Sequence, residues 1–286
     1  MTLYEPTDAP IRPEEVEAWR GHIGRREIRR QRLDIESLRR FAAAQGADMD
    51  VIARAPPLGH WAYFVDTVGP HALGPDGHPR RGGLLPAVRL PRRMFAAATM
   101  TFTEPMALDA EGELTIEVTD VRHRAGKTGD LVFVEVDRRL VQEGRERLAE
   151  HQTIVYRGLG ERTAPSVPTD PPPHRNAEVW TPGATDLFRF SAVTFNSHRI
   201  HYDLAYATDE EGYPGLVVHG PFTAAKLFTL ARTRGGRPIR RFAFRAMVPL
   251  FAGQPIYLAP GAEAGEVRAI RCDGAVAMSA TAGFDD

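Results

Sequence analysis

Short segments in which hydrophobic and polar positions alternate recur in both halves of the chain. They are rich in β-branched residues and are separated by glycine-containing turns. The segments are Leu114–Arg122, Leu131–Val141 and Arg147–Arg157 in the first half, and Ile239–Val248, Gln254–Ala259, Glu266–Arg271 and Val276–Ala282 in the second. Alternation with a period of two is typical of strands with one buried face, so we expect each half to end in an antiparallel meander.

A helical candidate precedes each meander. Pro221–Arg232 is apolar on nearly all sides, which predicts a helix enclosed by a sheet. Leu90–Met100, with Pro91 near its start, takes the corresponding place in the first half and is also predicted to be helical. Near the N-terminus, Leu33–Gln45 has Asp34 as its expected N-cap and one apolar face, which predicts a short amphipathic helix.

The two halves resemble each other over more than the meanders. Gly82–Pro91 and Gly212–Pro221 share glycines, an apolar run and a proline at the expected helix start. We therefore predict an internal duplication and an α+β double hot-dog fold, with two antiparallel sheets each wrapped around a central helix. The predicted units are a half at 1–158, a proline-rich linker at 159–183 and a second half at 184–286.

Composition describes an ordinary globular chain of 286 residues, of which 43% are hydrophobic and 26% are charged. Its net charge of −1 offers no global field for nucleic acid, so no nucleic-acid partner is expected. Cys272 is the only cysteine, which excludes a disulfide within one chain. The sequence lacks a long apolar run and an apolar leader, so we expect a cytoplasmic protein without membrane association.

Polar and titratable groups are concentrated in Phe190–Tyr206, directly after an apolar stretch. His219 and Gly220 follow shortly afterwards, where Pro221 should begin the buried helix. The unpaired N–H groups at such a helix start can stabilise negative charge that develops on an incoming oxygen. A polar loop beside an oxyanion site predicts chemistry on a thioester.

Several motifs carry a resemblance to a known family, and it extends from about Arg30 to Gly283. Phe190–Tyr206, which we call the hydratase loop, and the helix start in Leu216–Ala224 together resemble the hydratase motif of the MaoC-type hot-dog hydratases. More closely, the chain is similar to the hydroxyacyl-thioester dehydratase type 2 proteins and the bacterial mesaconyl-C(4)-CoA hydratases. The segments that carry this closer similarity are Trp61–Phe64, Gly74–Gly83, Leu90–Met94 and Thr194–Asp203. The resemblance implies a hydro-lyase that reversibly adds water to an α,β-unsaturated acyl thioester such as mesaconyl-C(4)-CoA, giving citramalyl-CoA.

The family motif places a carboxylate five residues before its final histidine, and this chain departs from that pattern. If His201 is that histidine, Asn196 occupies the carboxylate position, and a two-residue insertion would place Thr194 there instead. An amide cannot accept a proton, so His201 is the candidate general acid/base and Asn196 is expected to orient the water. Asp203 is a candidate to orient the imidazole, and the Gly220 N–H is the candidate oxyanion donor.

Further polar residues are candidates for binding the substrate. Arg92 and Arg93, together with Arg80 and Arg81, either bind the phosphates of coenzyme A or form a solvated turn. Arg199 and Arg245 are candidate partners for a free carboxylate on the acyl group. The remaining candidates are Tyr202 and His219, although His219 at the helix start is also expected to be a structural hydrogen-bonding group.

Alternative functions and sites remain open at this point. An acyl-CoA thioesterase or a non-catalytic acyl-thioester binding protein could share the fold. His198, His201 and Asp203 could together bind a metal, but the spacing is loose and we expect no metal. We also expect no cofactor beyond the coenzyme A of the substrate, one active site in the second half, a first half that has lost catalysis, and a monomer or homodimer.

Overall fold

The computed structural model describes residue 7 and residues 9–126, 129–170, 172–174 and 176–284. Its strands form one ten-stranded antiparallel sheet. Their bounds are β1 Arg26–Arg32, β2 Arg92–Phe102, β3 Glu111–Gly126, β4 Gly129–Gln142, β5 Arg145–Arg157, β6 Glu178–Trp180, β7 Ile239–Ala246, β8 Ile256–Pro260, β9 Glu266–Ile270 and β10 Val276–Phe284. The α-helices are α1 Pro13–Arg20, α2 Ile35–Gln45, α3 Ala184–Val193 and α4 Gly220–Gly235.

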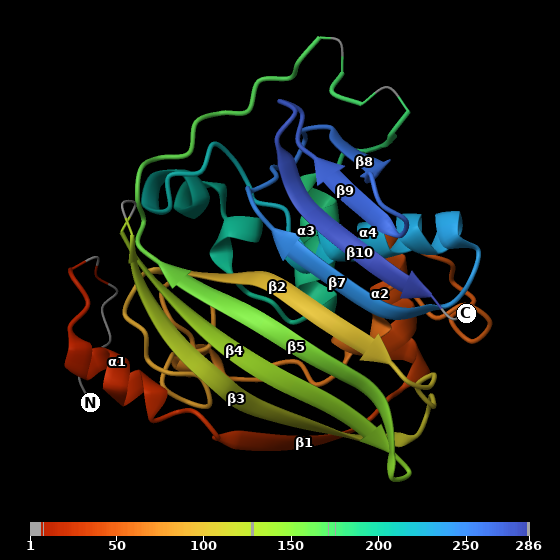
Figure 1. The fold of residues 1–286 in the computed structure, drawn as a ribbon, viewed down its shortest axis with the longest axis horizontal. Coiled ribbons are helices and arrows are strands. Elements are labelled where there is room, and N and C mark those ends of the chain that lie inside the picture. The colour runs from red at the N-terminus through yellow and green to blue at the C-terminus, as the bar shows by residue number, and fades with distance from the viewer. Residues whose placement is uncertain (1–6, 8, 127–128, 171, 175, 285–286) are drawn as a thin grey trace.

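The order of the strands shows the internal duplication directly. Across the sheet the strands run β1-β3-β4-β5-β2-β7-β10-β9-β8-β6, so the second five repeat the first five in mirrored order (Figure 1). β2 and β7 pair antiparallel at the centre and join the halves into a continuous sheet. The predicted double hot-dog fold is confirmed, although its two sheets are merged into one.

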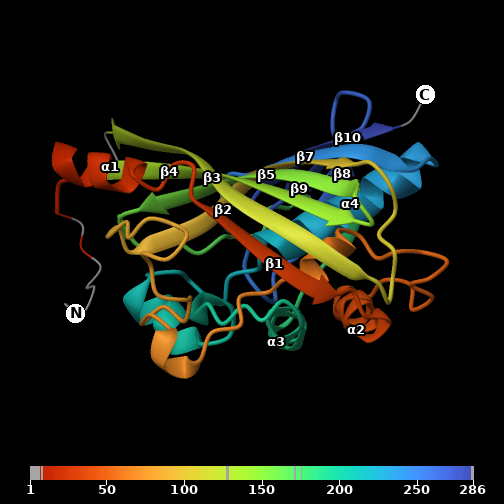
Figure 2. The same ribbon diagram turned by 90° about the horizontal axis from the view of Figure 1, so that it is seen from below.

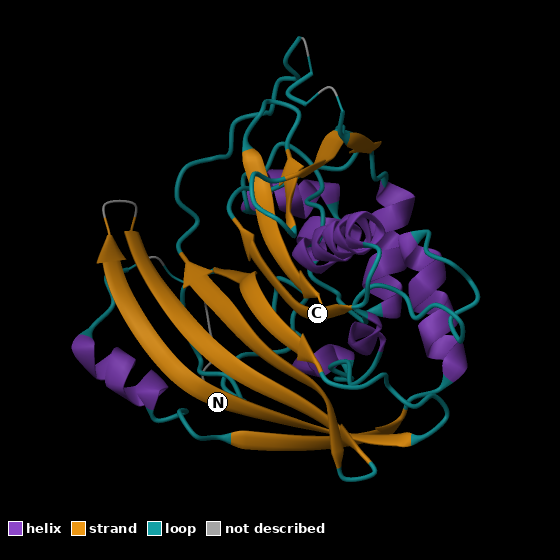
Figure 3. Cartoon of the chain, turned by 45° about the vertical axis from the view of Figure 1, so that its right-hand side comes forward, coloured by secondary structure: helices purple, strands orange, loops and turns teal. Residues whose placement is uncertain are grey.

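The helices are distributed unequally over this sheet. α4 packs against β7, β8, β9 and β10, and its buried side chains, including Phe222, Leu227 and Phe228, fill the curve of the second half. α2 packs chiefly against α3 and only lightly against α4. Both α2 and α3 lie on one side of the sheet (Figure 2). The long strands of the first half also curve, but in the described chain no helix runs along them as α4 does in the second half (Figure 3).

Most of the predicted elements are confirmed. All seven alternating segments lie within strands β3, β4, β5, β7, β8, β9 and β10 or overlap them closely. The predicted buried helix is α4, and the amphipathic helix is α2. Asp34 caps α2 as expected, because its Oδ1 accepts a hydrogen bond from the Ser37 N–H at 2.7 Å.

The predicted helix Leu90–Met100 is wrong. This segment contains most of β2, which pairs with β5 on one side and β7 on the other. Its alanines and methionines favour a helix intrinsically, but two flanking strands satisfy its backbone groups as a ladder, and this tertiary pairing overrides the propensity. The match between Gly82–Pro91 and Gly212–Pro221 is therefore wrong in register, since Pro91 precedes a strand and Pro221 lies in a helix.

Four elements were not predicted. β1 has the sequence REIRRQR, in which only one residue is strongly apolar, and it lies at an edge of the sheet. β6 interrupts the predicted linker at 159–183 by pairing with β8. α1 and α3, which are 8 and 10 residues long, were also missed. Among the described residues, no helix combines the length and apolarity needed to cross a lipid bilayer.

Candidate active site

The predicted polar segment Phe190–Tyr206 begins inside α3, which ends at Val193, and its loop follows from Thr194 onward. Thr194 caps the helix, and Phe195 has a positive φ of 49°, which turns the chain sharply. The Asn196 N–H then donates to the Ser191 carbonyl oxygen at 2.9 Å, and its side-chain Oδ1 accepts from the His198 N–H at 3.1 Å. The first bond holds the Asn196 backbone, and the second orients its side-chain amide so that Nδ2 can donate to a ligand.

Four histidines form one cluster behind this loop. The rings of His201 and His219 stack with 3.6 Å between centroids, and those of His78 and His198 approach to 4.1 Å. His198 and His201 meet edge to face at 5.4 Å. Burial lowers the pKa of His201 to about 3 and that of His198 to about 4, so both imidazoles are neutral at neutral pH.

Hydrogen bonds define the tautomer of His201. Its Nδ1 lies 2.7 Å from the Val217 carbonyl oxygen, and a carbonyl can only accept. Nδ1 therefore carries the proton, and Nε2 is the basic nitrogen. His219 is fully buried at the start of α4, and its Nε2 lies 2.8 Å from the Ser191 hydroxyl. This placement favours the expected structural hydrogen-bonding role over a contact with the substrate.

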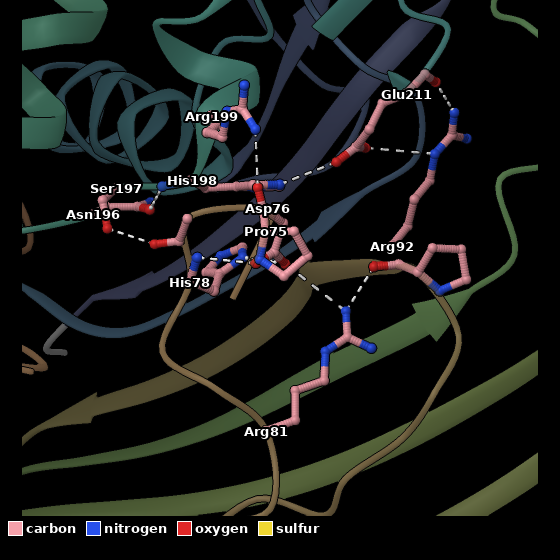
Figure 4. A network of polar contacts seen from close by, with 12 residues as sticks. Pro75, Asp76, His78, Arg81, Arg92, Asn196, Ser197, His198, Arg199 and Glu211 are labelled. Atoms are coloured by element: carbon pink, nitrogen blue, oxygen red, sulfur yellow. Dashed lines mark hydrogen bonds and ion pairs between the residues drawn. The ribbon is translucent and has the colours of Figure 1, made fainter. Parts of the chain in front are cut away.

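Glu211 contacts the histidine cluster at His198, and Arg92 contacts Glu211 (Figure 4). The Nε2 atom of His198 lies 3.3 Å from Glu211 Oε1, and Arg92 Nε lies 3.6 Å from Glu211 Oε2. Arg92 also donates to the Glu211 carbonyl oxygen and lies over the Tyr213 ring. Because it is buried and engaged in this way, Arg92 does not support the predicted contact with coenzyme A.

A loop from the first half, Gly74–Gly83, is hydrogen-bonded to the hydratase loop (Figure 4). The Arg199 N–H donates to the Asp76 carbonyl oxygen at 2.9 Å, and the Arg199 guanidinium donates to the Pro75 carbonyl oxygen at 3.1 Å. The Ser197 hydroxyl donates to the Gly77 carbonyl oxygen. Gly77 has a φ of +88°, and a Cβ there would lie only 1.9 Å from the Ser197 carbonyl oxygen, so the contact requires glycine.

A cavity of about 550 Å³ lies beside these two loops, a size suited to an organic ligand. The strands of the first half supply much of its wall, and the loop Gly74–Gly83 and the start of α4 supply further parts. Its lining residues include His78, Arg93, Ile154, Thr194, Asn196 and Pro221. The first half thus forms a large part of the site rather than standing apart from it.

Some of the predicted site residues lie at this cavity. Asn196 and Arg93 line it, and so does Thr194, the alternative to Asn196 in the motif alignment. Gly220 is the first residue of α4 and directly precedes the cavity-lining Pro221, so its N–H comes before the first helical hydrogen bond. A Cβ at Gly220 would come no closer than 3.6 Å to its nearest neighbour, so tight packing does not explain this glycine.

Other predicted site residues lie elsewhere. His201 is buried against His219 and does not line the cavity. Asp203 does not orient it, because the Asp203 carboxylate binds the Arg199 guanidinium at 2.8 Å and accepts from the Tyr206 N–H. This pair also occupies Arg199, which therefore holds loops together instead of facing a substrate carboxylate.

Tyr202 and Arg245 are likewise not among the residues that line the cavity. Tyr202 is exposed, and its hydroxyl donates to the Ser197 carbonyl oxygen at 3.0 Å. Arg245 is exposed on β7, where the neighbouring Phe244 is buried, so the alternation of the strand turns Arg245 to the outer face. Neither placement supports the predicted contact with the substrate.

Asp76 and His78 were not predicted as site residues. They lie in Gly74–Gly83, one of the segments that carry the family resemblance. His78 lines the cavity, and its Nδ1 lies 3.1 Å from Asp76 Oδ2. An aspartate two residues before a histidine, flanked by glycines in a loop, was the available signal.

Asp76, His78 and His198 also offer three potential ligand atoms within 4.8 Å of one another. However, the His78 Nδ1 is already bonded to Asp76, and Arg81 lies 3.8 Å from the same carboxylate. Arg93 lines the adjoining cavity, so a cation would face two guanidinium groups there. This charge arrangement favours a hydrogen-bonding role over a metal-binding one.

Comparisons with solved structures support the fold. A MaoC-like dehydratase from Phytophthora capsici aligns with a TM-score of 0.64 at 13% identity, over 95% of this chain and 99% of that one. A Mycobacterium tuberculosis protein described as having a double hotdog fold aligns with a TM-score of 0.52 at 13% identity, over 91% of this chain and 95% of that one. At such low identity the likeness concerns the fold alone.

Comparisons of sequence go further. The mesaconyl-C(4)-CoA hydratase of Chloroflexus aurantiacus is 43% identical over 79% of this chain and 82% of that protein. The mitochondrial hydroxyacyl-thioester dehydratase type 2 of Schizosaccharomyces pombe is 32% identical, over 42% of this chain and 41% of that protein. The family model of hydroxyacyl-thioester dehydratase type 2 matches residues 58–252. The chain therefore belongs to the hydroxyacyl-thioester dehydratase type 2 family of hydro-lyases.

Proposed function

We propose that this enzyme reversibly hydrates a short enoyl-CoA that carries a free carboxylate, with mesaconyl-C(4)-CoA as the substrate and citramalyl-CoA as the product. The observation that carries this proposal is that Arg93 lines the same cavity as Asn196. Among the described residues, the Arg93 side chain makes no hydrogen bond or ion pair with another residue. A guanidinium without a partner in a cavity is suited to binding a carboxylate.

The chemistry of the reaction matches the other groups at the site. Water adds to the β-carbon, a proton adds to the α-carbon, and the thioester oxygen carries negative charge in between. The Asn196 Oδ1 already accepts from the His198 N–H, so the Nδ2 of this amide is the group that would donate to the water. The Gly220 N–H at the start of α4 is suited to bind the thioester oxygen, and loss of such a donor typically costs about 3 kcal/mol.

Proton transfer then falls to the histidine cluster, of which His78 lines the cavity. The reaction needs no redox or electron-sink cofactor. We further propose that the enzyme acts in the cytoplasm, as a monomer or a homodimer.

Two measurements on the same reaction mixture test this function. Hydration removes the ultraviolet absorbance of the conjugated enoyl thioester and releases no thiol, whereas a thioesterase releases thiol and a binding protein does neither. We expect loss of absorbance without thiol release, and faster turnover of mesaconyl-C(4)-CoA than of crotonyl-CoA, which lacks the carboxylate. Thiol release at the rate of absorbance loss, or no reaction with any enoyl-CoA, would overturn the proposal.

The variant Arg93→Met tests how the carboxylate is recognised. Loss of a charge-assisted contact worth about 1.5–3 kcal/mol should lower kcat/KM for mesaconyl-C(4)-CoA by roughly ten- to a hundredfold. The same variant should change kcat/KM for crotonyl-CoA less than threefold. Arg245→Met on the outer face of β7 is the matched control and should leave both substrates unaffected. Equal losses of Arg93→Met on both substrates would contradict the assignment.

A further inference from the structure

The pair Asp76–His78 has the geometry of a catalytic dyad. Asp76 Oδ1 accepts from the His78 N–H at 3.0 Å, and Asp76 Oδ2 lies 3.1 Å from His78 Nδ1. Because a carboxylate can only accept, Nδ1 carries the ring proton and Nε2 has the basic lone pair. The bonds to one aspartate hold both the backbone and the ring of this histidine.

His78 is also the member of the histidine cluster that reaches the cavity. It lines the wall together with Asn196 and Arg93, whereas His198 and His201 do not. The His78 ring packs on that of His198 at 4.1 Å between centroids, which restricts its rotation. A substrate bound between Asn196 and Arg93 would therefore meet His78 before any other imidazole.

The first half thus supplies a carboxylate, Asp76, and an imidazole, His78, next to the hydratase loop of the second half. That loop has no carboxylate at the position where the family motif has one. The contacts of Ser197 and Arg199 with the backbone of Pro75, Asp76 and Gly77 make this arrangement specific. Neither alignment of the family motif puts an acid at its carboxylate position, since that position falls on Asn196 or on Thr194. Asp76 is the nearby acid that is bonded to a cavity-lining histidine.

We propose that His78 is a catalytic acid/base of this enzyme and that Asp76 is its positioning residue. This inference rests on the proposed hydratase function. His78 Nε2 takes a proton from water as the water oxygen forms a bond to the β-carbon and the π electrons move onto the thioester oxygen. The proton on Nε2 then passes to the α-carbon as the thioester carbonyl re-forms. Water supplies both added groups, and no oxidant or reductant is needed.

His78 is better suited to this role than His201. When Nε2 accepts a proton, the ring becomes an imidazolium, and the Asp76 carboxylate next to its Nδ1 stabilises that charge. His201 has only the neutral Val217 carbonyl oxygen at the equivalent nitrogen. A charged acceptor makes a stronger hydrogen bond to the imidazolium than a neutral one does.

The charges around His78 explain why it rests in the neutral form. Burial lowers its pKa well below 6.5, and Arg93 on β2, His198 and His201 from the hydratase loop, and Arg81 on its own loop lower it further. Asp76 is the acid bonded to the ring. Substitution of Asp76 should therefore change the pH dependence of kcat and not merely the amount of folded enzyme.

The test compares His78→Gln and Asp76→Asn with a matched pair on the surface. His151 and Asp137 form an exposed histidine–aspartate pair on β5 and β4, with 2.6 Å between Nδ1 and Oδ1. We expect His78→Gln to lower kcat at least a hundredfold and Asp76→Asn about tenfold, with KM changed less than threefold. Asp76→Asn should also shift the acid limb of the kcat profile. His151→Gln and Asp137→Asn should keep kcat within twofold.

Two results would overturn the inference. One is a folded His78→Gln enzyme with kcat within threefold of the wild type. The other is a loss of wild-type activity on dialysis against EDTA that zinc restores, since Asp76 and His78 would then act through an ion. Failure of the wild type to hydrate any enoyl-CoA would instead refute the proposed function, so the two failures are distinguishable.

Chemical modification of the wild-type enzyme covers the case in which His78→Gln does not fold. Diethylpyrocarbonate should modify His78 in step with the loss of activity, and crotonyl-CoA should slow both. Peptide mass spectrometry identifies the modified ring. Complete loss of activity while His78 stays unmodified, or modification of His78 without loss of activity, would overturn the role.

Discussion

The two halves of the sheet share a strand order but use their inner faces differently. In the second half the strands are 3–9 residues long and close around α4, whose Phe222 and Leu227 are buried. In the first half β3, β4 and β5 are 13–16 residues long, and their inner face forms much of the cavity wall. A duplicated fold can therefore fill one curve with a helix and reserve the other for a ligand.

Stability should reflect this difference most strongly in the core of α4. Leu227→Ala should lower the free energy of unfolding by about 3 kcal/mol, because the side chain is fully buried and its loss leaves a void. Ile154→Ala, on the cavity wall of β5, should cost about 1 kcal/mol or less, because that side chain already borders open space. Urea denaturation measures both, and equal costs would contradict the comparison.

The contact between the halves should matter more for activity than for stability. Gly77→Ala would place a methyl group against the Ser197 carbonyl oxygen and should displace the loop that carries His78. We expect kcat/KM to fall by roughly a hundredfold, the scale of losing one acid/base group, while α4 and its strands stay folded.

The matched control is Gly144→Ala in the β4–β5 turn. Gly144 also has a positive φ, of +73°, but no atom lies within 4 Å of a Cβ built there. This variant should lose about 1–2 kcal/mol of stability through backbone strain and keep full activity. An active Gly77→Ala enzyme would show that the docked loop is dispensable.

The buried histidine His201 and the buried acid Glu150 should affect the pH dependence of stability in different pH ranges. The pKa of His201 is lowered from 6.5 to about 3, so below pH 6.5 the unfolded chain binds a proton that the folded one does not. Stability therefore falls as the pH falls from 6.5, by roughly 1.4 kcal/mol per pH unit for this group. His201→Gln should reduce the slope between pH 6.5 and 5 by about that amount.

Glu150 provides the contrasting case. Burial opposes its ionisation, but His60 and Arg138, each 3.5 Å from its Oε2, outweigh that effect and lower its pKa from 4.5 to about 2. The stability that this carboxylate contributes is present above pH 4.5 and is lost as the pH falls through 2. Glu150→Gln should therefore leave the slope between pH 6.5 and 5 unchanged in urea titrations. A changed slope there would contradict this separation.

The fold could be predicted from the sequence wherever side-chain patterns were strong. Alternation located β3, β4, β5 and the strands of the second meander, and the all-round apolar character of 221–232 located α4. β2 was missed because its alanines and methionines carry no alternation, and its state depends on β5 and β7 on either side. β1 and β6 are edge strands; β1 has one strongly apolar residue and β6 is only three residues long, so neither shows a clear alternation.

The site was predicted only in part for a related reason. Asn196 and the helix start at Gly220 are local features, and both lie at or beside the cavity. The roles expected of Asp203 and Arg199 depended on partners that the sequence does not reveal, and these two side chains bind each other. His78 is 120 positions before His198, so their contact is a product of folding.

The sequence by itself determined the repeated strand pattern, the buried helix and the departure from the acid-containing motif, because these depend on residue type and local spacing. The tertiary structure decided which loops meet at the cavity and which imidazole faces it. Those outcomes depend on the pairing of β2 with β7 and on the docking of one loop on another. Contacts between distant segments set them, and no periodicity along the chain encodes such contacts.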